Sequence, residues 1–302
     1  MTNRYYVGQL FFNADPPIEI SRAEYDGAVD AVQGLLHSLD AEEKYDNLLE
    51  NYRELEEFIV GQSLRSLLSI RIADSNNHHA PRSTTGRKLS NFLSSVRLYQ
   101  DSVERHAVSI TGDTAIGPMV HEEKSSQFDR LQSYRTLEAL RNHAQHFALP
   151  VHGFTVALRR TDDLRYVDHE FSPEIHVDEL ALNPRFSPAK TLVELQAGPN
   201  RIKLKPLVRE YVQSLSAIHE KFRQLTWGAT EAHLDRFREL KSRLFFRNSE
   251  IDDIGIAVFP GDKDGHKTGA ETNLSAALPD ALTQLRDKNC HLVNFAARRV
   301  AY

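Results

Sequence analysis

Apolar residues recur every three or four positions over several long stretches of the chain, which is the pattern of helices that bury one face. The first such stretch predicts a helix from Asp40, a suitable N-cap with Glu43 three residues later, to about Ile72. Its apolar stripe consists of Tyr45, Leu48, Leu49, Tyr52, Leu55, Phe58 and Ile59.

Two further amphipathic helices follow, separated by polar segments with turn residues. The segment 73–86 contains proline and glycine and is predicted to be an exposed loop. The second helix is expected over about 88–107, and the third from His121 to just before Pro150. Three amphipathic helices joined by loops predict a bundle. The stripes are Leu89, Phe92, Leu93, Val96, Tyr99 and Val103, then Phe128, Leu131, Tyr134, Leu137, Ala144 and Phe147.

Beyond Pro150 the period changes from helical to alternating. The runs 154–158 and 174–182 predict a short β-hairpin insertion near 151–185. Helical periodicity returns after Pro206 and again around Leu234, with Trp227 predicted to lie in the core. Short strands are expected at 254–259 and 291–297.

The resulting fold class is mainly α, an antiparallel helical bundle with a β-hairpin insertion and an α+β C-terminal extension. The expected segments are an N-terminal part, 1–39, the bundle, 40–226, and the C-terminal extension, 227–302.

Composition narrows the possible functions. The chain carries 37 Lys and Arg against 42 Asp and Glu, so any site for an anion must be local. A single cysteine, Cys290, excludes an intrachain disulfide and a cysteine-based zinc site. No leader-like segment and no run of about 18 apolar residues is present, so we expect a cytoplasmic protein without a membrane partner. Glycine-rich phosphate loops and the G-x-S-x-G motif are also missing.

Polar groups crowd the end of the third predicted helix. Arg141, Asn142, His143, Gln145 and His146 fall within six positions. Arg141 lies at the edge of the apolar stripe, whereas His146 lies nearly opposite to it, four residues after Asn142. His146 also falls in the last helical turn, where the helix dipole favours the imidazolium form.

The pattern R-N-x-x-x-H formed by Arg141, Asn142 and His146 resembles that of the HEPN superfamily, over roughly residues 40–226. HEPN proteins are helical bundles, and many are metal-independent endoribonucleases of toxin–antitoxin, abortive-infection or CRISPR systems. The resemblance implies these three residues as catalytic groups, RNA as substrate, no metal or cofactor, and an antitoxin or regulatory protein as a further partner. An insertion of about fifty residues after the motif departs from the minimal family fold.

The residue types suit RNA cleavage by attack of its own 2′-hydroxyl group. Such cleavage needs a proton-transfer group and a cation over the phosphate, roles that suit His146 and Arg141. Because residues five positions apart on a helix point about 140° away from each other, one helix cannot direct both at one atom. The hypothesis therefore requires a homodimer with a composite site.

Three alternatives remain open at this point. Arg141, Asn142 and His146 could form a purely structural polar interface, or the domain could be a non-catalytic module that binds a nucleotide or a protein. His143, His146 and His152 could also form a three-histidine metal site. Basic residues at 201, 203, 205 and 209 could supply phosphate contacts in any RNA complex.

Overall fold

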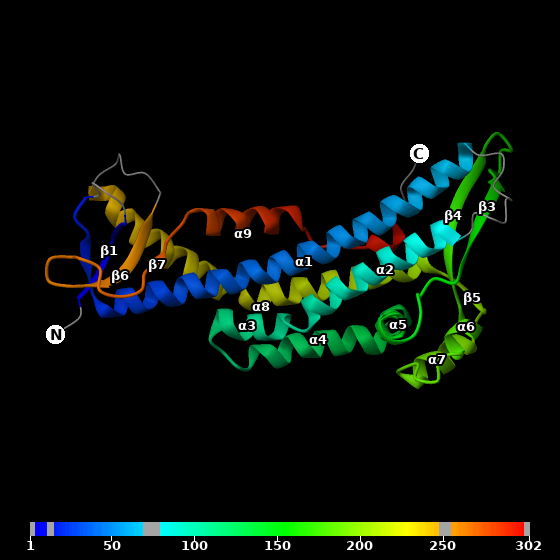
Figure 1. Ribbon diagram of the computed structural model, residues 1–302, viewed down its shortest axis with the longest axis horizontal. Helices are drawn as coiled ribbons and strands as arrows, with labels where there is room; N and C mark the ends of the chain where they lie inside the picture. Colours follow the sequence, from blue (N-terminus) through cyan, green and yellow to red (C-terminus); the bar gives the residue numbers. More distant parts are fainter. Residues whose placement is uncertain (1–3, 11–14, 69–78, 248–254, 299–302) are drawn as a thin grey trace. The chain divides into compact units, whose positions relative to one another are not determined.

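The computed structural model describes residues 4–10, 15–68, 79–247 and 255–298, and it is mainly helical with small antiparallel sheets (Figure 1). The helices are α1 (Arg22–Leu68), α2 (His79–Gln100), α3 (Val103–Thr111), α4 (Ile116–Arg130), α5 (Gln132–His146), α6 (Val177–Ala181), α7 (Ala189–Gln196), α8 (Leu204–Arg247) and α9 (Ala277–Lys288). The strands are β1 (Arg4–Gln9), β2 (Ile18–Ile20), β3 (Gly153–Arg160), β4 (Val167–His176), β5 (Arg201–Lys203), β6 (Ile256–Gly261) and β7 (Thr272–Asn273).

The chain divides into two compact units, to both of which α1 and α8 contribute. The first unit comprises residues 1–43, 102–120 and 221–290, and the second comprises 44–101, 121–220 and 291–302. Each unit therefore consists of discontinuous segments rather than of one stretch of sequence.

The first unit packs the beginning of α1 and the end of α8 against a four-stranded antiparallel sheet, ordered β2-β1-β6-β7. Glycine allows the two helices to approach closely, because a Cβ at Gly34 would lie 2.3 Å from Nε2 of His233. The core of this unit contains Val7, Ile20, Ala28, Val32, Leu35, Leu234, Phe237, Leu240, Leu244, Ile256, Val258, Leu274 and Leu282.

The second unit combines the end of α1 with α2, α4, α5 and the first part of α8, and it carries the sheet β3-β4-β5. The hairpin of β3 and β4 pairs Gly153 with Glu174 and Arg160 with Val167 at its two ends. The predicted helical stripes supply much of the core, since Tyr45, Leu48, Tyr52, Leu55, Ile59, Leu89, Phe92, Leu93, Val96, Tyr99, Tyr211, Leu215, Ile218 and Phe222 are all buried.

Several predicted helix boundaries are wrong. The first helix begins at Arg22 rather than Asp40, so the expected N-terminal segment contains two strands and the start of α1. Residues 79–86 of the predicted loop form the first turns of α2, because proline fits the first turn of a helix. The rest of that loop, 73–78, lies outside the described residues.

Other predicted elements are divided or joined. The predicted second helix is interrupted between α2 and α3, and the third consists of α4 and α5, separated at Leu131. The two helices expected after Pro206 are the single helix α8.

The predicted β elements are confirmed in part. The hairpin insertion and the strand at 256–259 are present, whereas 177–181 form α6 and 295–297 form a 3-10 helix. Trp227 is 52% exposed, in contrast to the predicted core position, and the Arg286 guanidinium lies 4.3 Å from its ring centre.

An ion pair buried in the first unit generates a test of its stability. The Glu42 carboxylate is 2% exposed and accepts hydrogen bonds from Nε and Nη2 of Arg223, at 2.8 and 2.6 Å. Because Arg223→Met leaves a buried charge poorly compensated, we expect a loss of about 3 kcal/mol in the free energy of unfolding. Urea denaturation measures this loss.

The control is Arg238→Met on the same helix, which removes an exposed pair with Asp235. This change should cost less than about 1 kcal/mol. Equal losses in the two variants would contradict the assigned role of the buried pair.

Candidate site at the end of helix α5

The first turns of α5 are fixed by buried polar contacts with α2 and α8. The amide of Gln100 donates to the Tyr134 hydroxyl at 2.7 Å, and the Tyr211 hydroxyl donates to the Glu138 carboxylate. Burial raises the pKa of Tyr211 well above its ordinary value, so this hydroxyl keeps its proton. The helix therefore enters its last two turns with a fixed orientation.

Arg141 is half-buried at the edge of α5, as its place beside the apolar stripe predicts. Its Nη1 donates to Oδ1 of Asn142 at 2.8 Å, and its Nη2 donates to Oε1 of Gln145 at 3.1 Å. Its Nε is buried without an acceptor. Because a guanidinium carries five N–H groups, one N–H on each terminal nitrogen is left for an external acceptor.

His146 has a different environment from Arg141, although both lie near the end of α5. Its side chain is exposed and makes no hydrogen bond or ion pair with the described residues. The structure thus joins Arg141 and Asn142 by a hydrogen bond, and it gives the His146 side chain no hydrogen bond to either of them.

Comparison with known proteins gives no relative in which this geometry could be compared. No family model, curated protein or solved structure matches the chain. None of the helices in the described ranges is both long enough and apolar enough to span a membrane.

His143, three residues before His146, lies on the buried face of α5 and is 1% exposed. Its Nδ1 lies 3.2 Å from Nδ2 of Asn183, whose Oδ1 accepts the Arg185 backbone N–H at 3.0 Å. That second bond fixes the orientation of the amide, so the Asn183 NH₂ group donates and Nδ1 of His143 accepts. The proton of the neutral imidazole is then on Nε2, which is buried without an acceptor.

His152, which precedes β3, also accepts a hydrogen bond through Nδ1. Its Nδ1 accepts the backbone N–H of His176 at 3.1 Å, so the neutral ring again carries its proton on Nε2. The ring of His152 stacks on that of His176 with 5.8 Å between the ring centres, and it lies 6.2 Å from the ring of His143. Sequence reasoning singled out His143 and His152, but it missed His176 and Asn183.

The arrangement does not favour the three-histidine metal alternative. His143, His146 and His152 do not bring their ligand atoms together in the way that a metal site requires, as judged over the described residues. In addition, the Nδ1 lone pairs of His143 and His152 already accept hydrogen bonds, and their Nε2 atoms carry protons. A metal ligand needs a free lone pair on the imidazole.

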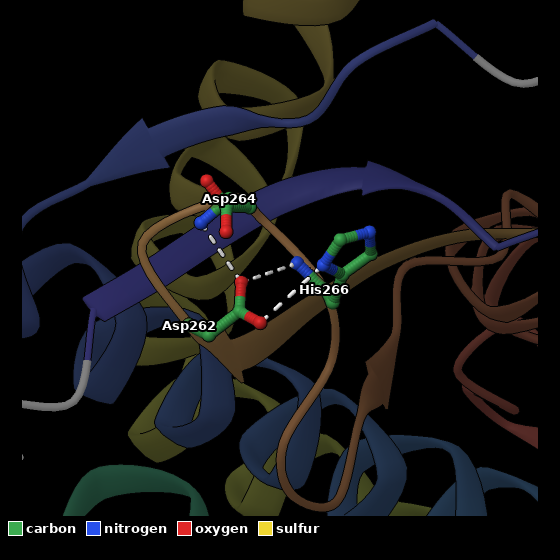
Figure 2. Close-up of side chains that lie close together, drawn as sticks. All are labelled: Asp262, Asp264 and His266. Atoms are coloured by element: carbon green, nitrogen blue, oxygen red, sulfur yellow. Dashed lines mark hydrogen bonds and ion pairs between the residues drawn. The ribbon is translucent and has the colours of Figure 1, made fainter.

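Another group of metal-binding residue types lies in the exposed loop between β6 and β7. Figure 2 shows the Asp262 carboxylate accepting the backbone N–H groups of Asp264 and His266, at 2.8 and 3.0 Å. These bonds hold the pKa of Asp262 below its ordinary value. The closeness of Asp262, Asp264 and His266 is therefore explained by hydrogen bonds within the loop itself. The alternating D-x-D-x-H sequence at 262–266 is the signal by which this group could have been found.

The basic residues that precede and begin α8 differ in exposure and in their partners. Arg201 and Lys203 are exposed on β5, and Nζ of Lys203 lies 3.6 Å from the Glu170 carboxylate. Arg209 is paired with Glu56 at 2.7 Å and also donates to the backbone oxygen of Arg298. Arg209 is therefore a structural group.

The contrast between the two histidines of α5 can be tested by truncation. His143→Ala removes a buried ring and leaves the Asn183 amide without its acceptor, so we expect a loss of about 2–4 kcal/mol in unfolding free energy. His146→Ala should change that free energy by less than about 0.5 kcal/mol, because the ring is exposed. Urea denaturation of both variants measures these changes, and a costly His146→Ala would contradict the placement of that side chain.

Proposed function

We propose that the chain is a metal-independent endoribonuclease of the HEPN type, with Arg141, Asn142 and His146 as its catalytic groups. The observation that carries this proposal is the end of α5, where a held guanidinium and an exposed imidazole lie five positions apart. The resemblance of the R-N-x-x-x-H pattern to that of HEPN nucleases supports the same assignment. A toxin or phage-defence role in the cytoplasm, with an antitoxin or regulatory protein as partner, follows from that resemblance.

In this mechanism the 2′-hydroxyl group of RNA attacks the adjacent phosphorus, and the 5′-oxygen of the next nucleotide leaves. His146 transfers protons, because an exposed imidazole can both accept the hydroxyl proton and donate to a leaving oxygen. Arg141 binds the phosphate oxygens through the N–H groups that Asn142 and Gln145 leave unused. Asn142 orients the guanidinium through their 2.8 Å hydrogen bond.

The proposal includes a homodimer. Arg141 and His146 diverge along one helix, so the arginine of one protomer has to meet the histidine of its partner across a two-fold axis. Gln145 and His146 are exposed at the end of α5, so a partner protomer can reach both side chains.

Cleavage of single-stranded RNA in EDTA tests the catalytic assignment. We expect wild-type cleavage to survive chelation, and His146→Ala and Arg141→Ala each to reduce the rate by at least about 10²-fold. The control is His121→Ala, which changes an exposed histidine of α4. Wild-type rates in either motif variant would refute the nuclease assignment, and RNA binding without any cleavage would favour the non-catalytic module.

Mixing the two inactive variants tests the composite site. A dimer of one His146→Ala and one Arg141→Ala protomer contains one site with both an intact arginine and an intact histidine. Random exchange makes half of the dimers mixed, so we expect about a quarter of the wild-type activity to return. Sedimentation velocity should show a dimer at tens of micromolar. A monomer, or no recovery on mixing, would contradict the shared site.

A further inference from the structure

The connection from α5 to β3 is held by two imidazole rings that both accept hydrogen bonds through Nδ1. His143 accepts from the Asn183 side chain, and His152 accepts from the backbone N–H of His176. The backbone N–H of His152 also donates to the Glu174 oxygen at 3.1 Å. The His152 ring therefore extends the β3–β4 ladder by one rung, with Nδ1 in the place of a carbonyl oxygen.

Both hydrogen bonds require a neutral ring. A proton on Nδ1 of His152 would face the His176 N–H, and a proton on Nδ1 of His143 would face the Asn183 amide hydrogens. Two donors cannot share a hydrogen bond, so each protonation breaks one contact. The amide of Asn183 cannot rotate to help, because its oxygen is bound to the Arg185 N–H.

The charges around His152 also oppose its protonation. Burial lowers its pKa to about 4, helped by His143 of α5, His176 of β4 and Arg82 of α2, while Asp178 of α6 acts in the opposite direction. Burial likewise lowers the pKa of His143. The groups that face the cluster from four elements thus leave the neutral form favoured.

We propose that His143 and His152 form an acid-operated latch, which ties the 147–152 connection to the segment from His176 to Asn183. The latch is closed while both rings are neutral and opens when either takes up a proton at Nδ1. The last turn of α5 is part of it, because the backbone N–H of Phe147 donates to the His143 oxygen at 2.9 Å. This inference does not depend on RNA cleavage.

The direction in which folding stability depends on pH follows from the lowered pKa of His152. In the unfolded chain His152 takes up its proton near pH 6.5, but in the folded chain it does so only near pH 4. Stability from the latch is therefore fully present above about pH 6.5 and is lost as the pH falls towards 4. A difference of this size lowers the folding equilibrium constant by about 10²-fold between pH 7.5 and 4.5.

The test compares urea denaturation of the full chain at these two pH values for the wild type, His152→Asn and His146→Asn. In His152→Asn the amide oxygen replaces Nδ1 as the acceptor and cannot be protonated there. We expect the wild type and His146→Asn to lose about 10²-fold more of their folding constant on acidification than His152→Asn does. Equal acid losses in the wild type and His152→Asn would overturn the latch.

Nitrogen-15 NMR of the histidine rings gives a second readout that does not require the variant to be stable. In the folded wild type, His143 and His152 should carry their protons on Nε2 at pH 7, and His152 should remain neutral at pH 5.5. A proton on Nδ1 of either ring at pH 7, or a charged His152 ring at pH 5.5 in the folded chain, would overturn the proposal.

Discussion

The packing of α1 against α8 depends on charged groups that are largely removed from water and must therefore be paired. In the first unit the pair is Glu42 with Arg223, and in the second it is Glu56 with Arg209. Each arginine uses two nitrogens to bind both carboxylate oxygens of its glutamate. An apolar stripe alone would tolerate a shift of a turn, but a shifted helix would leave these charges buried and unpaired. The pairs therefore select one antiparallel register within each unit.

The same requirement fixes α5 in the second unit. Its buried face presents Tyr134, Glu138 and His143, whose polar atoms are bound by Gln100, Tyr211 and Asn183. These three contacts come from α2, α8 and the segment after α6, so they hold the helix against rotation about its axis. The orientation of Arg141 and His146 is a consequence of this anchoring. It does not depend on contacts that the two residues make themselves.

Periodicity predicted the buried faces better than it predicted where helices begin and end. The stripes of α1, α2 and α8 are mostly buried as expected, because packing one face requires only the helical repeat. The start of α1 was missed because Gly27 and Gly34 weaken the helical periodicity of the sequence. In the structure, both glycines lie where side chains of α8 approach too closely for a Cβ. Trp227 was wrongly assigned to the core, because one face of its ring is covered by the Arg286 guanidinium and not by apolar side chains.

The sequence predicted only part of the candidate site, because the helical repeat predicts which face a residue lies on but not its partners. The repeat places His143 three residues after buried Leu140, at the edge of the apolar stripe, and it places His146 nearly opposite the centre of that stripe, so the exposure of His146 could have been predicted. The partner of His143 could not be predicted, because Asn183 approaches α5 only through the folding of the hairpin insertion. His143 and His146 lie within one turn of α5 but have different chemical requirements. On the buried face, an imidazole must stay neutral to keep its hydrogen bond. On the exposed face, an imidazole is open to solvent and can exchange its proton. A spacing of three residues separates the two rings by only about 60° around the helix, so both environments occur because His143 lies at the edge of the buried face and His146 lies beyond that edge.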